Sequence, residues 1–304
     1  MSIKKWLASN TSSLEGRVVA VSGTTGGLGG EICRYLASAC ASLVLLDRNR
    51  ARSEAHRDEL MRLNPGISVS CVHLDLEDIA TAKEAVDILR EKRIDVFIHN
   101  AGAYSIPRHQ TAVGYDNVFQ INFATPYYMI RELLPTLRER RGRVVVVGSI
   151  AHRYSKTRTD DIDFSSDKSS SRVYGNAKRY LMFSLFELFK QEESVSLSVV
   201  HPGITFTNIT AHYPKVIFAI IKYPMKLIFM SPRRAALSIL AGVFDSTERC
   251  TWIGPRVFDI WGLPKKTRLR GVSEAEIGNI SAAAETVYER CLNALDTGIN
   301  VLGD

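Results

Sequence analysis

Short runs of apolar residues alternate with longer segments of mixed polarity along most of the chain. The runs are nearly continuous and rich in Val, Ile and Leu, as in strands that are buried on both faces of a sheet. They are RVVAVS (17–22), SLVLLD (42–47), SVSCVHL (68–74), IDVFIHN (94–100), RVVVVGS (143–149) and VSLSVVH (195–201). The alternation predicts an α/β fold, a doubly wound parallel sheet whose ligands bind at the carboxyl ends of the strands.

Residues 204–230 break this alternation and are rich in Ile, Phe and Met. Lys215, Lys222 and Lys226 are spaced seven and four apart, so they would share one face of a helix, although Pro224 argues against one continuous helix. Two interpretations are open: an apolar lid over a lipophilic substrate, or a segment that lies on a membrane surface. We favour the lid, with peripheral membrane contact as an additional role.

The remaining C-terminal segment predicts structure rather than chemistry. Ser231 and Pro232 suit the N-cap and first position of a helix, CTWIG (250–254) suits a last strand, and 273–295 suits a C-terminal helix. Because no linker, repeat or low-complexity tract divides the chain, we expect one domain over 1–304. Its parts would be a core (14–203), the lid (204–230) and a C-terminal extension (231–304).

Composition and charge exclude several classes of protein. The 304 residues are 45% hydrophobic and 23% charged. The net charge is +7, but the basic residues are scattered along the sequence, and no nucleic-acid-binding module is recognisable. Five cysteines show no metal-ligand spacing, so we expect no metal site. The chain shows neither a signal peptide nor 18 consecutive uncharged apolar residues. We therefore expect a cytoplasmic protein that does not bind nucleic acid.

A glycine-rich segment, SGTTGGLGG, follows the first predicted strand and leads into an amphipathic helix. Gly23, Gly27 and Gly29 have the spacing G-x-x-x-G-x-G. Such glycines allow a tight bend and the close approach of a pyrophosphate, and the helix N-terminus offers free N–H groups to the anion. Between a strand and a helix, this pattern predicts a dinucleotide site and a Rossmann-type sheet.

The second predicted strand ends in Asp47, at the position where a dinucleotide fold places an acid against the adenine ribose hydroxyls. A carboxylate there repels the 2'-phosphate of NADP. Arg48 follows directly and could bind that phosphate or stack on adenine. We favour NAD and keep NADP as the alternative.

Tyr174 and Lys178 lie four residues apart in YGNAK, so on a helix they would project from one face. A tyrosine pKa near 10 must fall by roughly 3 units for acid–base catalysis at neutral pH, which corresponds to about 4 kcal/mol. A nearby ammonium, together with a cofactor charge in a site that excludes water, can supply an effect of this size. The pair is therefore a candidate for proton transfer.

Seven segments together resemble the short-chain dehydrogenase/reductase family over roughly residues 14–260. They are SGTTGGLG (22–29), HLDL (73–76), HNAG (99–102), QIN (120–122), GS (148–149), YGNAK (174–178) and HPGITFT (201–207). Ser22 replaces the usual threonine, and His99 replaces the usual first asparagine of N-N-A-G. The 25 positions from Ser149 to Tyr174, with SIAH (149–152), are similar to the retinol-dehydrogenase-like or hydroxysteroid-dehydrogenase-like branch. Asp47 departs from that branch, which prefers NADP.

The resemblance implies a role for each matched residue. Tyr174 would exchange the proton with the substrate oxygen, Ser149 would hydrogen-bond that oxygen, Lys178 would lower the pKa of Tyr174 and bind the nicotinamide ribose, and Asn122 would hold a water. Ile204 and Thr207 would orient the carboxamide. The expected cofactor contacts are Ser22, Gly23, Thr25, Gly27, Leu28, Gly29, Asp47, Arg48, Asp75, Leu76, Asn100, Ala101, Gly102, Tyr174, Lys178, Pro202, Gly203, Ile204 and Thr207.

These residues favour an NAD(P)-dependent oxidoreductase that interconverts an apolar alcohol and its carbonyl compound, such as a steroid, retinoid or long-chain molecule. The resemblance implies a homodimer or homotetramer. Two alternatives without turnover stay open on the same fold: a dinucleotide-sensing regulator and a membrane-surface protein. The intact Ser149, Tyr174 and Lys178 favour the enzyme, since a sensor has no need of all three.

Overall fold

The computed structural model describes residues 1–204, 229–245, 248, 250–269 and 271–298. Within these residues the strands form one eight-stranded sheet in the order β3-β2-β1-β4-β5-β6-β7-β8. The strands are β1 (Val18–Ser22), β2 (Ser42–Asp47), β3 (Val69–His73), β4 (Val96–His99), β5 (Arg143–Val147), β6 (Ser196–Val200), β7 (Thr251–Val257) and β8 (Trp261–Arg268). The six N-terminal strands and the CTWIG strand predicted from the sequence are confirmed, with ends that shift by at most three residues.

The strands from β1 to β7 run parallel, and β8 pairs with β7 in the antiparallel sense. Val19 on β1 lies opposite Leu43 of β2 on one side and Val96 of β4 on the other. The order of the sheet therefore reverses between β1 and β4. This is the switch point at which doubly wound sheets bind their ligands. The fold is the expected α/β, Rossmann-like sheet.

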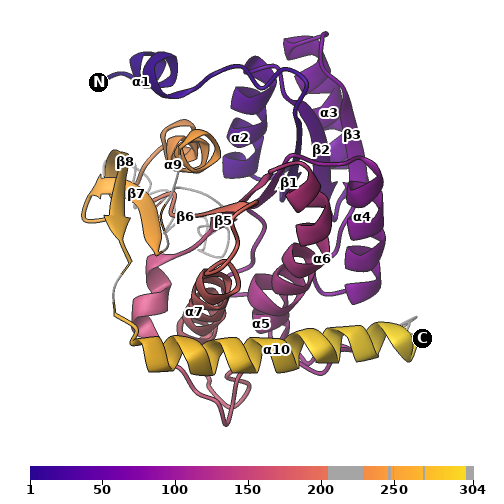
Figure 1. The fold of residues 1–304 in the computed structure, drawn as a ribbon, viewed down its shortest axis with the longest axis vertical. Helices are drawn as coiled ribbons and strands as arrows, with labels where there is room; N and C mark the ends of the chain where they lie inside the picture. Colours follow the sequence, from indigo (N-terminus) through magenta and orange to yellow (C-terminus); the bar gives the residue numbers. More distant parts are fainter. Residues whose placement is uncertain (205–228, 246–247, 249, 270, 299–304) are drawn as a thin grey trace, which may run out of the picture.

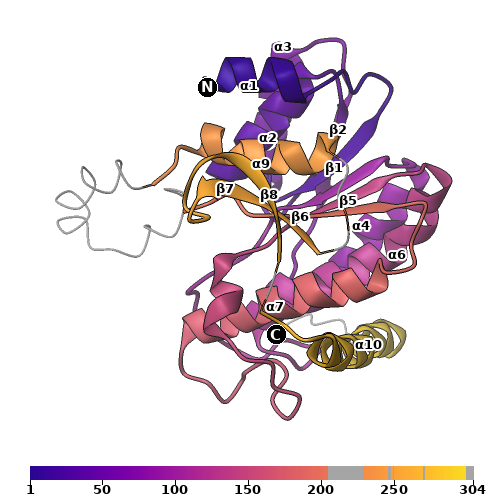
Figure 2. The same ribbon diagram turned by 60° about the vertical axis from the view of Figure 1, so that its left-hand side comes forward.

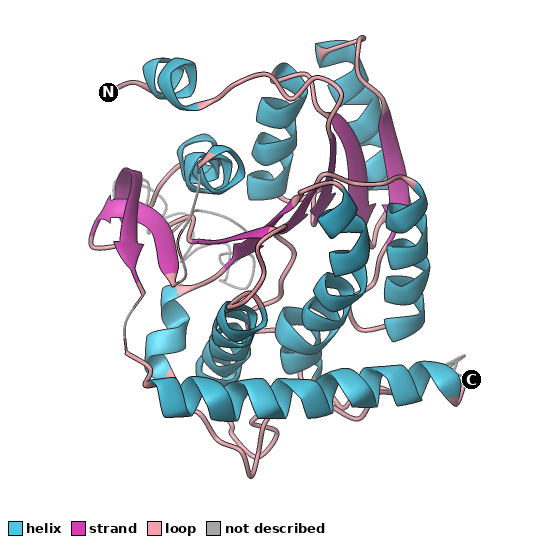
Figure 3. Ribbon diagram, in the orientation of Figure 1, coloured by secondary structure: helices cyan, strands magenta, loops and turns pink. Residues whose placement is uncertain are grey.

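Helices cover both faces of the sheet (Figure 1; Figure 3). They are α1 (Ile3–Asn10), α2 (Gly27–Ser38), α3 (Arg50–Leu63), α4 (Ile79–Glu91), α5 (Asn117–Phe119), η1 (Gln120–Ala124), α6 (Thr125–Glu139), η2 (Ile150–Tyr154), α7 (Ser170–Leu188), α9 (Pro232–Phe244) and α10 (Glu274–Asp296). Residues of α1, α2, α3 and α9 form one apolar core with the sheet, and residues of α4, α6, α7 and α10 form the other. Burial on both faces explains the continuous apolar strands.

The helix α10 lies across the outer side of α7, α6 and α4 (Figure 2). It begins after Ser273, whose hydroxyl accepts a hydrogen bond from the Glu276 N–H at 3.2 Å, and its buried face includes Ile280 and Val287. In the structure α10 covers part of the apolar surface of α7, while the predicted oligomer stays a prediction.

Residues 205–228, most of the predicted lid, lie outside the described residues. Ile204 and Met230, which are described, lie close together, because the Met230 N–H donates a main-chain hydrogen bond to the Ile204 oxygen at 2.9 Å. No helix in the described part of the chain combines the length and the apolar character that a bilayer span requires.

Candidate active site

The glycine loop between β1 and α2 makes a tight bend because two of its glycines pack against main-chain atoms and leave no room for a side chain. Gly23 has a φ of +72°, and a Cβ there would lie 2.9 Å from the Ala101 Cα. A Cβ on Gly29 would lie 2.1 Å from the Gly23 oxygen. Gly26 is the N-cap of α2 and makes no side-chain cap bond, so the first N–H groups of the helix keep their capacity for an anion.

The loop after β4 is hydrogen-bonded to the start of the glycine loop. The Ser22 hydroxyl oxygen accepts from the main-chain N–H groups of Asn100 and Ala101, both at 3.1 Å. Because these bonds occupy its two lone pairs, its own proton is available for His99 Nδ1, 3.2 Å away, and Nε2 then carries the ring proton. Burial and the charge of Lys178 hold the pKa of His99 well below its ordinary value. The two departures from the family pattern thus form one bonded pair.

Asn100 completes this connection through its side chain. Its Nδ2 donates to the main-chain oxygens of Ser22 at 3.1 Å and Gly23 at 3.0 Å. The ends of β1 and β4 are therefore held together at the switch point of the sheet. Ala101 is half-buried beside Gly23, and Gly102, the next residue, is exposed.

Asp47 at the end of β2 is 3% exposed, and its carboxylate is turned toward the glycine loop. It accepts from the Thr24 hydroxyl, from the Thr25 N–H at 3.1 Å and from the Ser53 hydroxyl at 2.9 Å. Arg48 beside it is exposed. Asp47 therefore shapes the glycine loop directly, a role that the sequence did not indicate.

Asp75 and Leu76 lie in the loop that joins β3 to α4. The Asp75 N–H donates to Thr81 Oγ1 at 3.0 Å, and its carboxylate accepts from the Glu77 N–H at 3.1 Å. Leu76 is buried, and its main-chain oxygen accepts from the Thr125 hydroxyl at 2.8 Å. These bonds fix the loop at the carboxyl end of the sheet, next to the other predicted contacts.

The four predicted catalytic residues come from three elements that meet at this end of the sheet. Ser149 follows β5, Tyr174 and Lys178 lie on α7, and Asn122 lies in η1. A Cβ on Gly102 would lie 2.7 Å from Asn122 Oδ1 and 3.6 Å from Lys178 Nζ, so these groups surround one point. The nearby Ser149 hydroxyl lowers the pKa of Tyr174, so the two hydroxyls lie near each other.

Asn122 lies in a π-helical turn between α5 and α6 rather than just inside a regular long helix. Its Nδ2 donates to the oxygens of Ala103 and Val118, both at 2.8 Å. Its Oδ1 is buried and has no hydrogen-bond partner among the described residues. A buried acceptor of this kind requires a donor, which fits the water expected there.

The protonation of Tyr174 differs from the sequence-based argument. Burial raises the pKa of Tyr174 to about 12, although the hydrogen bond with Ser149 lowers it. Burial also lowers the pKa of Lys178 to about 8. The Lys178 ammonium donates to the Val147 oxygen at 3.0 Å and lies 5.9 Å from the Tyr174 ring centroid. This pKa is that of the chain without the cofactor charge that the sequence-based argument includes, so the lowering of the Tyr174 pKa toward 7 stays a prediction.

Tyr104 is a site residue that the motifs missed. Its ring meets the Tyr174 ring edge-on, with centroids 5.2 Å apart and an interplanar angle of 78°. Its hydroxyl is 2.7 Å from the Ser171 hydroxyl at the start of α7. Tyr104 lies just after HNAG, and an aromatic residue two positions beyond that motif is the signal that could have identified it.

The residues after β6 form the other side of the site. Gly203 has a φ of +80°, and a Cβ there would lie 2.6 Å from the Ile260 oxygen. The Ile204 N–H donates to that same oxygen at 3.4 Å. Pro202 is buried in the same turn. Thr207, the last predicted carboxamide contact, lies outside the described residues.

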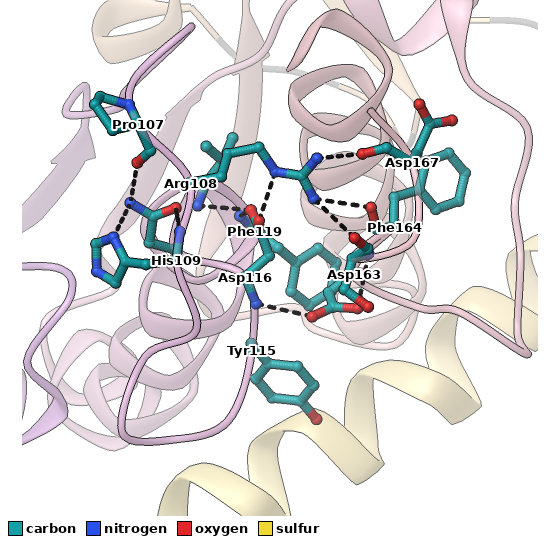
Figure 4. Close-up of polar contacts among 12 residues, drawn as sticks. Pro107, Arg108, His109, Tyr115, Asp116, Phe119, Asp163, Phe164 and Asp167 are labelled. Carbon is teal, nitrogen blue, oxygen red and sulfur yellow. Dashed lines mark hydrogen bonds and ion pairs between the residues drawn. The ribbon is translucent and has the colours of Figure 1, made fainter. Parts of the chain in front are cut away.

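Arg108 ties the loop that carries Tyr104 to the segment between Ser149 and Tyr174 (Figure 4). Its Nε donates to Asp116 at 2.7 Å, and its other nitrogens donate to the main-chain oxygens of Phe164 at 3.0 Å and Asp167. Asp163 accepts from the Asp116 N–H at 2.8 Å. The segment between Ser149 and Tyr174, which spans the 25 positions noted in the sequence, thus forms a wall beside Tyr174.

The described residues fit a dinucleotide on structural grounds. Gly26 and Gly27 place no side chain over the N-terminus of α2, the first turn of α2 has N–H groups without a side-chain cap, and Asn122 presents a buried acceptor without a described partner. All three lie at the switch point of the sheet. Together they are the candidate site for a phosphate-bearing cofactor, next to the predicted proton-transfer groups.

Comparisons with known proteins agree with this geometry. The family model "short chain dehydrogenase" matches residues 17–215. Retinol dehydrogenase 12 of Mus musculus is 29% identical over 218 residues, 69% of each chain. Polyprenol dehydrogenase of Homo sapiens is 25% identical over 76% of this chain and 74% of its own.

Solved structures match the fold at lower identity. An uncharacterised protein of Mycobacterium paratuberculosis has a TM-score of 0.76 at 22% identity, over 93% of this chain and 97% of its own. A 3-oxoacyl (acyl-carrier-protein) reductase of Agrobacterium tumefaciens C58, solved with NADP bound, has a TM-score of 0.59 at 21% identity, over 78% of this chain and 90% of its own. The match to the family model over most of the sheet is the decisive comparison: the chain belongs to the short-chain dehydrogenase family, and within it resembles the retinol dehydrogenases.

Proposed function

We propose that this NAD(P)-dependent oxidoreductase interconverts an apolar alcohol and its carbonyl compound, with Tyr174 as the acid and base. The observation that carries the proposal is the position of the Tyr174 phenol near the Ser149 hydroxyl and the buried Lys178 ammonium. Two neighbouring hydroxyls can both reach one substrate oxygen. A bound nicotinamide supplies or accepts the hydride.

The chain's own residues account for the proton. In reduction Tyr174 donates its phenolic proton to the substrate oxygen, and in oxidation it receives that proton back. Ser149 holds the oxygen in position by a hydrogen bond. Since burial raises the Tyr174 pKa to about 12, the phenol is protonated at neutral pH, which suits the reductive direction. Oxidation requires an added positive charge nearby to lower that pKa.

The cofactor would lie along the carboxyl ends of β1, β2 and β4. The glycine loop and the N-terminus of α2 would hold the pyrophosphate, and the adenine ribose would lie at the end of β2, near the buried Asp47 and the exposed Arg48. Lys178 and the turn at Gly203 would hold the nicotinamide end. We propose NAD over NADP because the buried Asp47 carboxylate places negative charge beside the ribose position.

The apolar substrate is supported by composition and by relatives. Residues 204–230, which follow Gly203 in the sequence, are rich in Ile, Phe and Met, and the names of two relatives refer to retinol and polyprenol. We propose further that 204–230 form the lid and contact a membrane surface, in a cytoplasmic protein that forms a homodimer or homotetramer. Co-sedimentation with anionic vesicles tests the membrane contact, and sedimentation equilibrium tests the oligomeric state.

The testing experiment compares the wild type with Tyr174→Phe. Retinoid, steroid and polyprenol alcohols and carbonyls are offered with NADH, NADPH and their oxidised forms. We expect turnover of at least one apolar pair, a loss of kcat of about 100- to 10,000-fold in Tyr174→Phe, and dinucleotide affinity within about 3-fold of the wild type. Turnover that survives Tyr174→Phe would remove this residue from the mechanism.

A further inference from the structure

The histidine of SIAH lies directly behind the catalytic serine. His152 is 1% exposed, and its Nδ1 lies 2.6 Å from the main-chain oxygen of Ser149. The main-chain N–H of His152 also donates to that oxygen, at 3.2 Å. A carbonyl oxygen only accepts, so Nδ1 carries the proton, and the ring side chain supplies the shorter of the two bonds.

The His152 ring is held from two sides by aromatic side chains. Trp252 of β7 meets it at 5.7 Å between centroids and 65° between planes, and Phe183 of α7 at 6.2 Å and 69°. Trp252 is itself fixed, because its indole N–H donates to Asp259 at 2.9 Å and Arg153 pairs with the same carboxylate at 2.8 Å. The aromatic side chains from β7 and α7 therefore fix the direction in which the His152 Nδ1–H points.

The main chain around His152 is also connected to the C-terminal helix. The Arg179 guanidinium donates to the His152 oxygen at 3.4 Å and to Glu276 of α10 at 2.5 Å. The turn that follows Ser149 is thus braced by α7, β7 and α10. A brace of this kind restricts rotation of the peptide that carries Ser149.

The orientation of the Ser149 hydroxyl depends on that peptide. Ser149 is the N-cap of η2, with φ −147° and ψ 145°, and its Oγ accepts from the Ala151 N–H at 3.2 Å. A change in ψ would rotate the hydroxyl relative to Tyr174. We infer that His152 is a positioning residue for the proposed reaction: its Nδ1–H fixes the Ser149 carbonyl, and through it the serine hydroxyl that meets the substrate oxygen.

This inference rests on the proposed function for its kinetic consequence, so one of its two tests does not need turnover. In the protein labelled with 15N-histidine, the imidazole spectrum at neutral pH shows which ring nitrogen carries the proton. The imidazole signals of His152 are identified by their absence from the spectrum of the His152→Asn variant. We expect a neutral ring with a slowly exchanging Nδ1–H. An Nε2–H tautomer or a doubly protonated ring would overturn the inference, whether or not the protein turns over a substrate.

The kinetic test uses two variants of His152 and the Ser149→Ala background. An asparagine can present its Nδ2–H near the histidine Nδ1, whereas leucine presents no donor. We expect His152→Leu to lower kcat about 10- to 100-fold with little change in dinucleotide affinity, and His152→Asn to stay within about 3-fold of the wild type.

In Ser149→Ala the hydroxyl that His152 positions is gone. His152→Leu should then change the residual kcat less than about 2-fold, because two residues that act through one group are not additive. An equal loss in both backgrounds would mean that His152 supports the fold rather than Ser149. A wild type without turnover on the whole panel would reject the proposed function. The 15N spectrum alone would then show whether the His152 Nδ1–H bonds to the Ser149 oxygen.

Discussion

Lys178 Nζ donates to the Val147 oxygen at 3.0 Å and lies 5.9 Å from the centroid of the Tyr174 ring. The side chain is 2% exposed, and burial lowers its pKa to about 8. A buried ammonium with a depressed pKa costs stability wherever it is still protonated. The buried Lys178 ammonium therefore lowers the stability of the folded protein, as is common where function requires a buried charge.

Lys178→Met tests this cost. At pH 7 the variant should gain about 1–2 kcal/mol in free energy of unfolding while losing turnover. The folded pKa lies below the unfolded value of 10.5, so the wild type gains stability as the pH rises from about 8 toward 10.5. The advantage of the variant should shrink over that window. Urea unfolding at several pH values measures it, with the exposed Lys190→Met as control; an advantage independent of pH would contradict the account.

Asp47→Asn tests the choice of cofactor. Asparagine keeps an acceptor for the Thr25 N–H and removes the negative charge, so the loop should survive the change. We expect the preference for NADH over NADPH to fall about 10-fold, the effect of roughly 1.4 kcal/mol of repulsion. Ser53→Ala, which removes one hydrogen bond and no charge, is the matched control. Fluorescence titration gives the ratio, and an unchanged ratio in Asp47→Asn removes this carboxylate from cofactor selection.

Gly29→Ala tests the glycine loop. The new Cβ would lie 2.1 Å from the Gly23 oxygen, so the loop must move. We expect dinucleotide affinity to fall more than about 10-fold and the free energy of unfolding to fall by about 1–3 kcal/mol. Gly278→Ala on the exposed side of α10 is the control, since a Cβ there meets nothing within 4 Å. That variant should be up to about 1 kcal/mol more stable. Wild-type affinity in Gly29→Ala would show that the loop is not the phosphate site.

Arg108→Met tests the wall beside Tyr174. It removes an ion pair with Asp116, whose side chain is 5% exposed, and leaves the oxygens of Phe164 and Asp167 without this donor. We expect a loss of about 2 kcal/mol in stability and a higher KM for the substrate, with dinucleotide affinity unchanged. Arg93→Met removes a pair with Glu139 in which both side chains are exposed, and should cost less than about 0.5 kcal/mol. An equal rise in KM in both variants would argue against a specific role for Arg108.

The sequence alone predicted the strands β1 to β7, the parallel sense of the sheet and a place for the cofactor, which stays a prediction. These features depend on patterns within a few residues: continuous apolar runs, glycines between a strand and a helix, and the four-residue spacing of Tyr174 and Lys178. Because each strand end carries its motif, the order of motifs along the chain also placed Ser149 and Asn122 near them. Local chemistry was sufficient for this part of the site.

Only the tertiary structure decided the contacts between residues far apart in the chain. The antiparallel β8, the cover of α7 by α10, the bond from Ser22 to His99 and the bonds of Arg108 to the 164–167 segment all join separate elements. The pKa of Tyr174 also depended on burial, which spacing does not reveal. A sequence pattern shows which residues share one face of a helix or strand. The partners of a residue and its exposure to solvent arise only when distant segments pack together.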